Sequence, residues 1–338
     1  MGHRDIVVIG GSAGSLQVLQ TILPALPWDF PAAVFVVLHT SEDSPGLLPE
    51  ILNRGSKLPV MYAVHGADIL PARVYIAPAG QRHMLLDRGR VRLEPGPREN
   101  RSRPSIDALF RSASYAYGNQ VIGVVLSGNL DDGSASVLAI KNRGGMAIAQ
   151  DPDEALAPSM PASAIEAIAL DFVLRAEQIG PKLVALAPIE STEEVRTIST
   201  GEGNMSGNMS ATGQTYACPE CGGVLEEAKE GGMLRFRCRV GHMYSPESLL
   251  ADQTEAVEKA LWAAIRSMEE QAEFSDRLAD TSQQKKRPRL AHRFTEKALA
   301  SRENATILRD LLQKTSDEVL EIPLEDGKSE YEERTGTD

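Results

Sequence analysis

The stretch Asp5–Leu23, DIVVIGGSAGSLQVLQTIL, decides how the beginning of the chain folds. Asp5–Ile9 is a short β-branched run that ends in glycine, and leucines then recur at helical spacing as far as Leu23. The pattern predicts a strand, a tight turn and a helix, with Ser12 on the turn. A nucleophile would be exposed at such a position.

Glycines flank Ser12 at the spacing of a G-x-S-x-G nucleophile elbow, with Gly10 before it and Gly14 after it. In this kind of turn the hydroxyl is exposed, and the N–H groups of Ala13 and Gly14 are candidates for stabilising an oxyanion. The alternative is a tight turn in which Ser12 only caps the helix. A nucleotide-binding protein is disfavoured, because the chain lacks both G-x-G-x-x-G at this turn and G-x-x-x-x-G-K-[ST].

The composition indicates a globular protein with more than one domain. The chain has 338 residues, of which 42% are hydrophobic and 24% are charged, enough apolar material for a core. A net charge of -12 disfavours a nucleic-acid partner. No apolar run reaches membrane-spanning length and no secretory signal precedes the first strand, so we expect a cytoplasmic protein without membrane insertion.

Short apolar strands alternate with helical stretches up to about residue 187, which predicts an α/β domain with a doubly wound, mostly parallel sheet. The predicted strands are 6–9, 33–38, 59–63, 74–77, 121–126, 146–149 and 172–174. An antiparallel hairpin is expected at 83–87 and 91–94. The predicted helices are 15–23, 46–53, 105–117, 133–142 and 161–169.

The α/β domain is expected to span residues 1–187, and the rest of the chain is expected to form four further segments. Residues 188–216 are rich in Thr, Ser, Gly, Asn and Glu without periodicity, which predicts a flexible linker. A zinc-ribbon-like module is expected at 217–245, and an antiparallel helical hairpin at 246–320. The acidic segment 321–338 has few large apolar side chains and is expected to be disordered.

All three cysteines of the chain lie in one short window. Cys218-Pro-Glu-Cys221 is followed after sixteen residues by Cys238-Arg-Val-Gly-His242. Two ligand pairs at zinc-knuckle spacing predict a tetrahedral Zn²⁺ site of three thiolates and one imidazole. With no open position the metal is expected to be structural, and so small a module needs it to fold. The alternative is free thiols on a loop, and we expect no cofactor for catalysis.

Polar side chains also follow three strands of the predicted sheet. Ser12 follows the first strand, His39 closes AAVFVVLHT, and Asp131 and Asp132 follow VIGVVLSGN. Because the carboxyl ends of parallel strands meet at one rim, a nucleophile, a base and an orienting carboxylate can meet there. A serine needs a base to take its proton, and that base needs a carboxylate on its other nitrogen. The alternative for His39 is a strand-end histidine bonded to the backbone.

The segments around these polar residues show a family resemblance. Residues 1–187 resemble the catalytic domain of the chemotaxis receptor methylesterase family (CheB). The resemblance is carried by VVIGGSAGSLQVLQTIL, FVVLHTS, VYIAPAGQRHMLL, RPSIDALFRSAS, VIGVVLSGNLDDGSAS and AIAQDPDEALAPSMPASAI. It implies a serine hydrolase that cleaves glutamyl methyl esters on chemoreceptors and deamidates particular glutamines. It also implies that Ser12 is the nucleophile, His39 the general base and acid, and Asp132 the carboxylate that orients the imidazole. Asp131 then has no assigned role.

The chain departs from the family pattern around the predicted site. Ser15 and Ser136 stand where the family usually has Gly, and Asn129-Leu130 stands where it often has Met-Gly. Because these positions surround the predicted site, they concern the prediction of the substrate and not that of the triad. The best-known members of the family also carry an N-terminal phospho-receiver domain, whereas this chain begins at the catalytic domain. We therefore expect a stand-alone form, whose switch is absent or is supplied by a separate receiver protein.

The leading hypothesis is thus a methylesterase whose partner is a methylated chemoreceptor or a similar helical protein. The rival hypothesis is a catalytically weak signalling scaffold whose zinc-helix tail binds a partner protein. A serine-directed phosphonate should label Ser12 in an enzyme and nothing in a scaffold. Four arginines around Pro104-Ser105 are interpreted as a solvated basic loop, the alternative being that they hold an acidic receptor helix or shield the site: Arg98, Arg101, Arg103 and Arg111.

Overall fold

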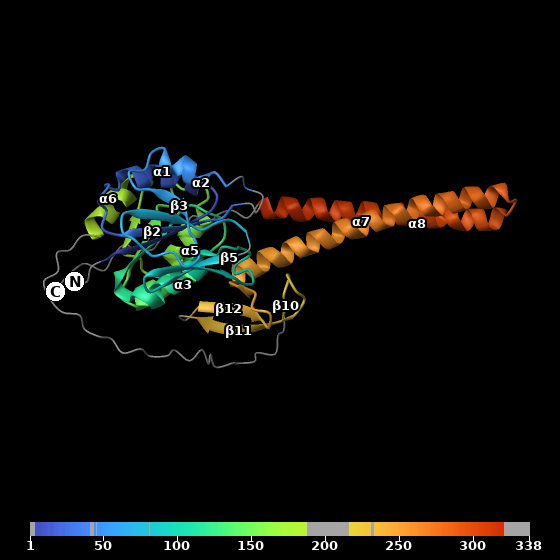
Figure 1. Ribbon diagram of the computed structural model, residues 1–338. Coiled ribbons are helices and arrows are strands. Elements are labelled where there is room, and N and C mark those ends of the chain that lie inside the picture. Colours follow the sequence, from blue (N-terminus) through green and yellow to red (C-terminus); the bar gives the residue numbers. More distant parts are fainter. Residues whose placement is uncertain are drawn as a thin grey trace, which may run out of the picture. The chain divides into compact units, whose positions relative to one another are not determined.

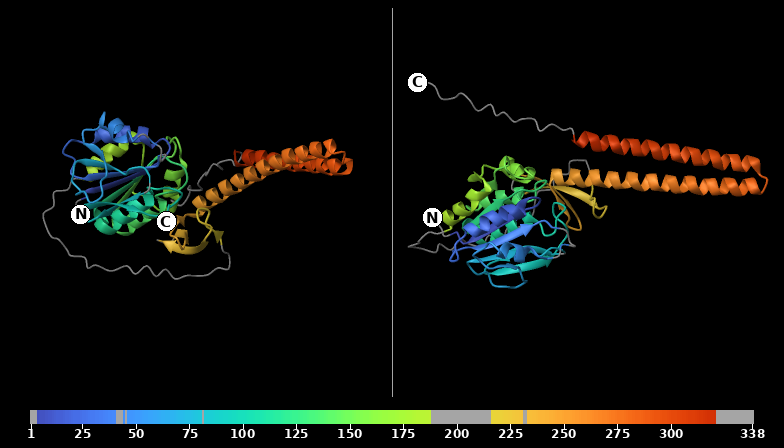
Figure 2. Two further views of the ribbon diagram at one scale, coloured as in Figure 1. Left: turned by 45° about the vertical axis from the view of Figure 1, so that its right-hand side comes forward. Right: turned by 90° about the horizontal axis from the view of Figure 1, so that it is seen from above.

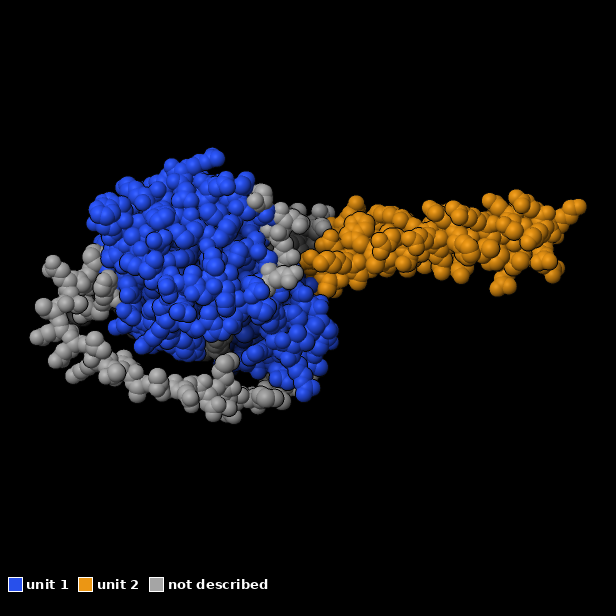
Figure 3. All heavy atoms as spheres, viewed as in Figure 1, with its two compact units in different colours: residues 1–252 blue, residues 253–338 orange. Residues whose placement is uncertain are grey.

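The structure is a computed structural model that describes residues 4–40, 44, 46–80, 82–187, 216–230 and 233–320. The predicted linker, apart from Tyr216, and the predicted acidic tail lie outside the described residues. The chain separates into two compact units, Met1–Asp252 and Gln253–Asp338 (Figure 3). No helix in the described ranges combines the length and the apolar character that a membrane span requires. The finer domain boundaries given above stay predictions.

A seven-stranded parallel sheet forms the centre of the first unit (Figure 1). Its strand order is β3-β4-β2-β1-β7-β8-β9, and all neighbouring strands pair in parallel. The strands are β1 (Ile6–Gly11), β2 (Ala33–Leu38), β3 (Val60–Tyr62), β4 (Arg73–Ile76), β7 (Val121–Val125), β8 (Met146–Gln150) and β9 (Phe172–Leu174). The chain runs outward in opposite directions from β1 and from β7, so a topological switch point lies between these two strands.

Helices cover both faces of the sheet, each over its own apolar cluster (Figures 1 and 2). One face carries α1 (Ser15–Ala25), α2 (Leu48–Asn53) and α6 (Ala176–Leu186). The other carries α3 (Ile106–Tyr117), α4 (Ser134–Asn142), α5 (Ser159–Ala167) and the hairpin of β5 (Arg82–Asp87) and β6 (Arg90–Pro95). A short 3-10 turn, η1 (Gly118–Gln120), precedes β7. The predicted doubly wound α/β class is confirmed.

One helix of this domain was not predicted. Helix α6 contains Gly180 and Pro181 in its middle, and both residues interrupt the helical pattern of a sequence. A Cβ atom at Gly180 would lie 2.6 Å from the Cβ of Ala25, so the glycine lets α6 pack closely on α1. Tertiary packing therefore overrides the weak local signal.

The module that the sequence predicts to bind zinc, called the metal module below, is a four-stranded antiparallel sheet within the first unit. Its strands are β10 (Tyr216–Ala217), β11 (Val224–Glu230), β12 (Met233–Cys238) and β13 (Met243–Tyr244). Its core is small, with Leu225, Phe236, Tyr244 and Leu249 packed beside two cysteines. Such a core is too small to stabilise a fold without a further cross-link.

Two long helices, α7 (Pro246–Gln284) and α8 (Pro288–Leu320), follow the module. Ion pairs of Glu269 with Arg309 and of Asp276 with Arg302 show that they run antiparallel, as predicted. The buried seam consists mainly of small residues at seven-residue intervals: Ile265, Ala272 and Ala279 on α7, and Ala291, Ala298, Ala305 and Leu312 on α8. This is coiled-coil spacing. Several larger apolar residues of the two helices are exposed instead: Leu250, Val257, Ile307 and Leu311.

Candidate active site

Ser12 lies on the turn between β1 and α1, where the elbow pattern predicted it. Its N–H donates to the carbonyl of Ser127, in the loop after β7, at 2.9 Å. Gly14 has a φ of +83°, and a Cβ atom there would lie 2.7 Å from the Cβ of Leu156. Only glycine fits this position without strain. Within the described part of the chain, the N–H groups of Ala13 and Gly14 have no hydrogen-bond acceptor.

His39 follows β2, and its Nε2 lies 2.9 Å from Oδ2 of Asp132. Because an ionised carboxylate can only accept, Nε2 carries the proton in the neutral ring and Nδ1 is the basic nitrogen. Nδ1 lies 3.3 Å from Oγ of Ser102. No hydrogen bond joins Ser12 to His39 among the described residues, although both line the same pocket. Such bonds often form only when substrate is bound.

Asp132 is a buried carboxylate at the N-terminus of α3. It accepts hydrogen bonds from the side chains of His39, Asn100 and Ser105 and from the N–H groups of Ile106 and Asp107. Burial alone would raise its pKa. The hydrogen bond and charge of His39, with further donors, outweigh burial and lower the pKa to about 2. Asp132 is therefore ionised at neutral pH and fixes the orientation of the imidazole ring.

A pocket of about 340 Å³ opens beside Ser12 and His39. Its walls are mostly apolar, with two further polar residues, and consist of Leu16, Leu38, Thr40, Ser44, Leu47, Leu48 and Ile51. Mostly apolar walls with a few convergent polar groups are typical of small-ligand sites.

Two of the residues that depart from the family pattern support the loops behind the site. Oγ of Ser15 donates to the carbonyl of Ser127 at 2.5 Å. Oγ of Ser136 donates to the carbonyl of Asp107 at 3.0 Å. Leu130 adopts a φ of 63°, a left-handed conformation in which glycine would be unstrained. The two serines therefore add hydrogen bonds at positions where glycine would add none.

The interpretation of the arginines near Pro104 as a solvated basic loop was wrong. Arg111 pairs with Glu99 at 2.8 Å, Arg98 pairs with Glu220 at 3.0 Å, and Arg101 pairs with Asp252. Arg103 donates to the carbonyl of Gly96 at 2.8 Å. Two of the partners lie far along the chain, in or next to the metal module. No local pattern in a single sequence could have revealed these pairs.

The four predicted metal ligands come together in the structure. The Sγ atoms of Cys218, Cys221 and Cys238 and a ring nitrogen of His242 all lie within 4.8 Å of one another. Sγ of Cys221 and Sγ of Cys238 are 3.7 Å apart. A tetrahedral Zn²⁺ with bonds of about 2.3 Å requires sulfur atoms about 3.8 Å apart, so this donor set fits such an ion.

One of these predicted ligands, Cys238, favours the ionised form that metals bind. Burial would raise the pKa of the Cys238 thiol. Hydrogen bonds from His242 and from the N–H of Gly241 outweigh burial and lower the pKa to about 6. The thiolate form therefore predominates at neutral pH.

The fold and these contacts define an α/β protein in which a serine on an elbow, a histidine and a buried aspartate gather at the carboxyl ends of three adjacent central strands, β1, β2 and β7. Residues 7–183 match the family model of the CheB methylesterase. The chain belongs to the CheB methylesterase family.

Individual relatives support this membership. A protein from Leptospira interrogans, named for protein-glutamate methylesterase and protein-glutamine glutaminase activities, is 38% identical over 185 residues, 54% of this chain and 95% of that protein. A "Protein-glutamate methylesterase/protein-glutamine glutaminase 2" from Anaeromyxobacter dehalogenans is 39% identical over 175 residues, 52% of this chain and 51% of its own. The crystal structure of the Thermotoga maritima CheB methylesterase catalytic domain matches with a TM-score of 0.52 and 36% identity, over 54% of this chain and 98% of that one.

Proposed function

We propose that this chain hydrolyses glutamyl methyl esters, and deamidates glutamines, on chemoreceptor-type proteins through Ser12, His39 and Asp132. The observation that carries the proposal is the 2.9 Å contact between Nε2 of His39 and Asp132, on the same rim as the Ser12 elbow. The names of the relatives supply the substrate class.

In the proposed reaction, Oγ of Ser12 attacks the γ-carbonyl carbon of the modified glutamate. Nδ1 of His39 accepts the serine proton, and Asp132 stabilises the resulting imidazolium. The N–H groups of Ala13 and Gly14 stabilise the oxyanion. His39 then donates its proton to the leaving methoxide, which departs as methanol, or to the leaving NH2 group of a glutamine, which departs as ammonia. Water, activated by His39, hydrolyses the acyl-enzyme and releases glutamate.

The apolar walls of the pocket agree with an uncharged substrate. Leu16, Leu38, Leu47 and Ile51 can contact a methyl ester or an amide without leaving a charge unpaired. The carboxylate product would have to lose its hydration shell against the same walls. The pocket therefore favours the ester over the acid, which promotes product release.

The test is methanol release from chemoreceptor fragments that carry labelled methyl esters. We expect release by the wild type and its loss in Ser12→Ala. Ser56→Ala is a matched control, because Ser56 lies on the turn after α2 and, among the described residues, its hydroxyl bonds only to the backbone of Leu58, at 2.8 and 3.1 Å. A serine-directed phosphonate should label the wild type and Ser56→Ala, but not Ser12→Ala. If the folded wild type released no methanol and took no label, the scaffold hypothesis would replace the esterase.

We also propose that Cys218, Cys221, Cys238 and His242 hold one structural Zn²⁺. The mutual distances of the ligand atoms and the small core of the module support this proposal. Metal analysis of the purified protein should give one zinc per chain in the wild type and none in Cys238→Ser. Full zinc content in that variant would contradict the assigned ligand set.

A further inference from the structure

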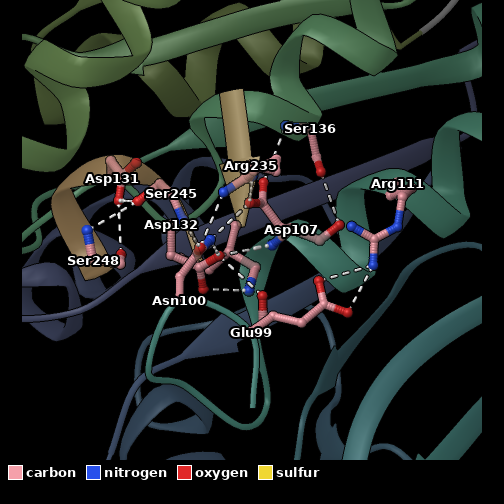
Figure 4. A network of polar contacts seen from close by, with 12 residues as sticks. Glu99, Asn100, Asp107, Arg111, Asp131, Asp132, Ser136, Arg235, Ser245 and Ser248 are labelled. Atoms are coloured by element: carbon pink, nitrogen blue, oxygen red, sulfur yellow. Dashed lines mark hydrogen bonds and ion pairs between the residues drawn. The ribbon is translucent and has the colours of Figure 1, made fainter. Parts of the chain in front are cut away.

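A network of buried polar side chains joins the catalytic domain to the metal module (Figure 4). At its centre, Nδ2 of Asn100 donates to Asp132 at 3.0 Å and to Asp107 at 2.8 Å. Oδ1 of Asn100 accepts from Nη1 of Arg235 at 3.0 Å and from the N–H of Ser245 at 3.1 Å. The amide thus uses both donors on catalytic-domain carboxylates and both lone pairs on donors from beyond residue 216.

Arg235 is the cation of this network. It lies on β12, its side chain is 3% exposed, and it forms an ion pair with Asp107, whose side chain is 1% exposed. Breaking a buried pair is costly, because the remaining charge is left without its partner in a poorly hydrated place. Arg235 therefore restrains Asp107 and Asn100 together.

The module also restrains the backbone of the loop that carries Asn100. The N–H of Asn100 donates to the carbonyl of Met243, in β13, at 2.9 Å. Asn100 and Arg101 have φ angles of 47° and 66°, a conformation that is unfavourable for residues with side chains. The next residue, Ser102, places its Oγ 3.3 Å from Nδ1 of His39. The loop thus contacts both the imidazole and its carboxylate partner.

A second attachment lies on the residue before the catalytic carboxylate. Oδ1 of Asp131 accepts hydrogen bonds from Oγ of Ser245 at 2.8 Å and from Oγ of Ser248 at 3.0 Å. Both serines are buried: Ser245 directly precedes α7, and Ser248 lies in its first turn. The segment that follows the metal ligands therefore also holds the loop that carries Asp132.

We infer that Arg235 is a positioning residue for the pair of His39 and Asp132, so that turnover depends on a folded, metal-loaded module. The inference rests on the proposed function. Arg235 precedes the ligand Cys238 by three residues, and Met243 follows the ligand His242 directly. Loss of the metal frees the strands that hold Asn100. Asp132 keeps its bonds to the N–H groups of α3, so the rate falls without being abolished.

The test compares full-length Arg235→Met and Arg235→Lys with wild type. We expect Arg235→Met to lower kcat by about 10- to 100-fold, because small displacements of catalytic groups have effects of this size. KM should change little. The acid limb of the pH profile of kcat/KM should move to lower pH, because a displaced carboxylate stabilises protonated His39 less. A merely structural defect would reduce the active fraction and leave that limb in place. Arg235→Lys keeps a charge for Asp107 and should be intermediate.

Arg237→Met is the matched control, because Arg237 is an exposed arginine on the same strand. It should behave as wild type. Zinc content reports whether the module of each variant is folded, and Arg235→Lys replaces Arg235→Met if the latter loses its metal. A double variant, Asn100→Ala with Arg235→Met, should lose less activity than the product of the two single losses, because part of the effect of Arg235 passes through Asn100.

A readout without substrate separates this inference from the proposed function. The Nε2–H proton of His39, hydrogen-bonded to Asp132, is expected to give a resonance in ¹⁵N-labelled protein. It should shift in Arg235→Met, and it should shift in wild type stripped by a chelator and return on adding Zn²⁺. Absence of methanol release by wild type would overturn the proposed function alone. An unmoved resonance and an unmoved pH profile in zinc-loaded Arg235→Met would overturn the inference.

Discussion

At the scale of single residues, Asp132 is surrounded by hydrogen-bond donors and His39 is oriented by it. An asparagine at this position would turn an NH2 group toward one set of these donors. If that group faced His39, Nε2 would have to accept and Nδ1 would carry the proton. In the proposed mechanism, Nδ1 could then no longer take the proton of Ser12.

We therefore expect Asp132→Asn to lower kcat by about 10³- to 10⁴-fold, as the wrong histidine tautomer does in serine hydrolases. Methanol release under saturating substrate measures it. Asp131→Asn is the neighbouring control: its oxygen can still accept from Ser245 and Ser248, and it should keep most of the activity. An active Asp132→Asn variant would mean that another group orients His39.

The lowered pKa of Asp132 has a consequence for stability. Its pKa falls from 3.8 to about 2 on folding, so the folded state favours the carboxylate. The resulting stabilisation is complete above the unfolded pKa and is lost as the pH falls through the folded pKa. Between pH 5 and pH 2.5, wild type should lose about 1 to 2 kcal/mol more unfolding free energy than Asp132→Asn. Urea denaturation at the two pH values measures this difference, and a pH-independent difference would contradict the assigned shift.

At the scale of elements, the elbow between β1 and α1 depends on Gly14. Gly14→Ala places a Cβ atom 2.7 Å from Leu156 and 2.8 Å from Oγ of Ser127, at a φ of +83°. We expect it to cost about 2 to 3 kcal/mol of stability and to lower kcat at least about 10-fold, because the N–H groups beside Ser12 move.

Gly66→Ala separates backbone strain from packing. Gly66 has a φ of +79°, and nothing lies within 4 Å of a Cβ atom built there. It should cost about 1 kcal/mol, from the backbone alone, and leave activity unchanged. Thermal unfolding and methanol release measured together compare the two variants. Equal effects on activity would show that the elbow has no special role.

The strands could be predicted because each central strand is a short β-branched run, buried on both faces in a parallel sheet. The same logic placed Ser12, His39 and Asp132 at one rim, since they follow strand ends. The contacts of Asn100 with Arg235 could not be predicted, because they join residues 135 positions apart through buried side chains. The pattern of large apolar residues did not indicate the whole seam of α7 and α8, because close packing there buries small residues such as Ala272 and Ser301.

At the scale of the whole molecule, the described contacts of the site come from the first unit. The residues that restrain Asp132 and its loop lie between Asn100 and Ser248 in the sequence. The loop that carries Asn100 also forms an ion pair of Arg101 with Asp252. The second unit, from Gln253 onward, has its own antiparallel seam. We therefore expect that catalysis does not need the helical hairpin and that its rate depends on the metal module.

Two truncations test this division. A chain that ends at Asp252 keeps Arg235, Ser245 and the metal ligands, so we expect zinc content and Ser12-dependent methanol release close to those of the full chain. A chain that ends at Ala187 loses the cation beside Asp107 and the backbone partner of Asn100, so its kcat should fall about 10-fold or more. Circular dichroism checks that both fragments are folded. A folded 1–252 fragment without activity would show that the hairpin takes part in turnover, and an undiminished 1–187 fragment would show that the module does not.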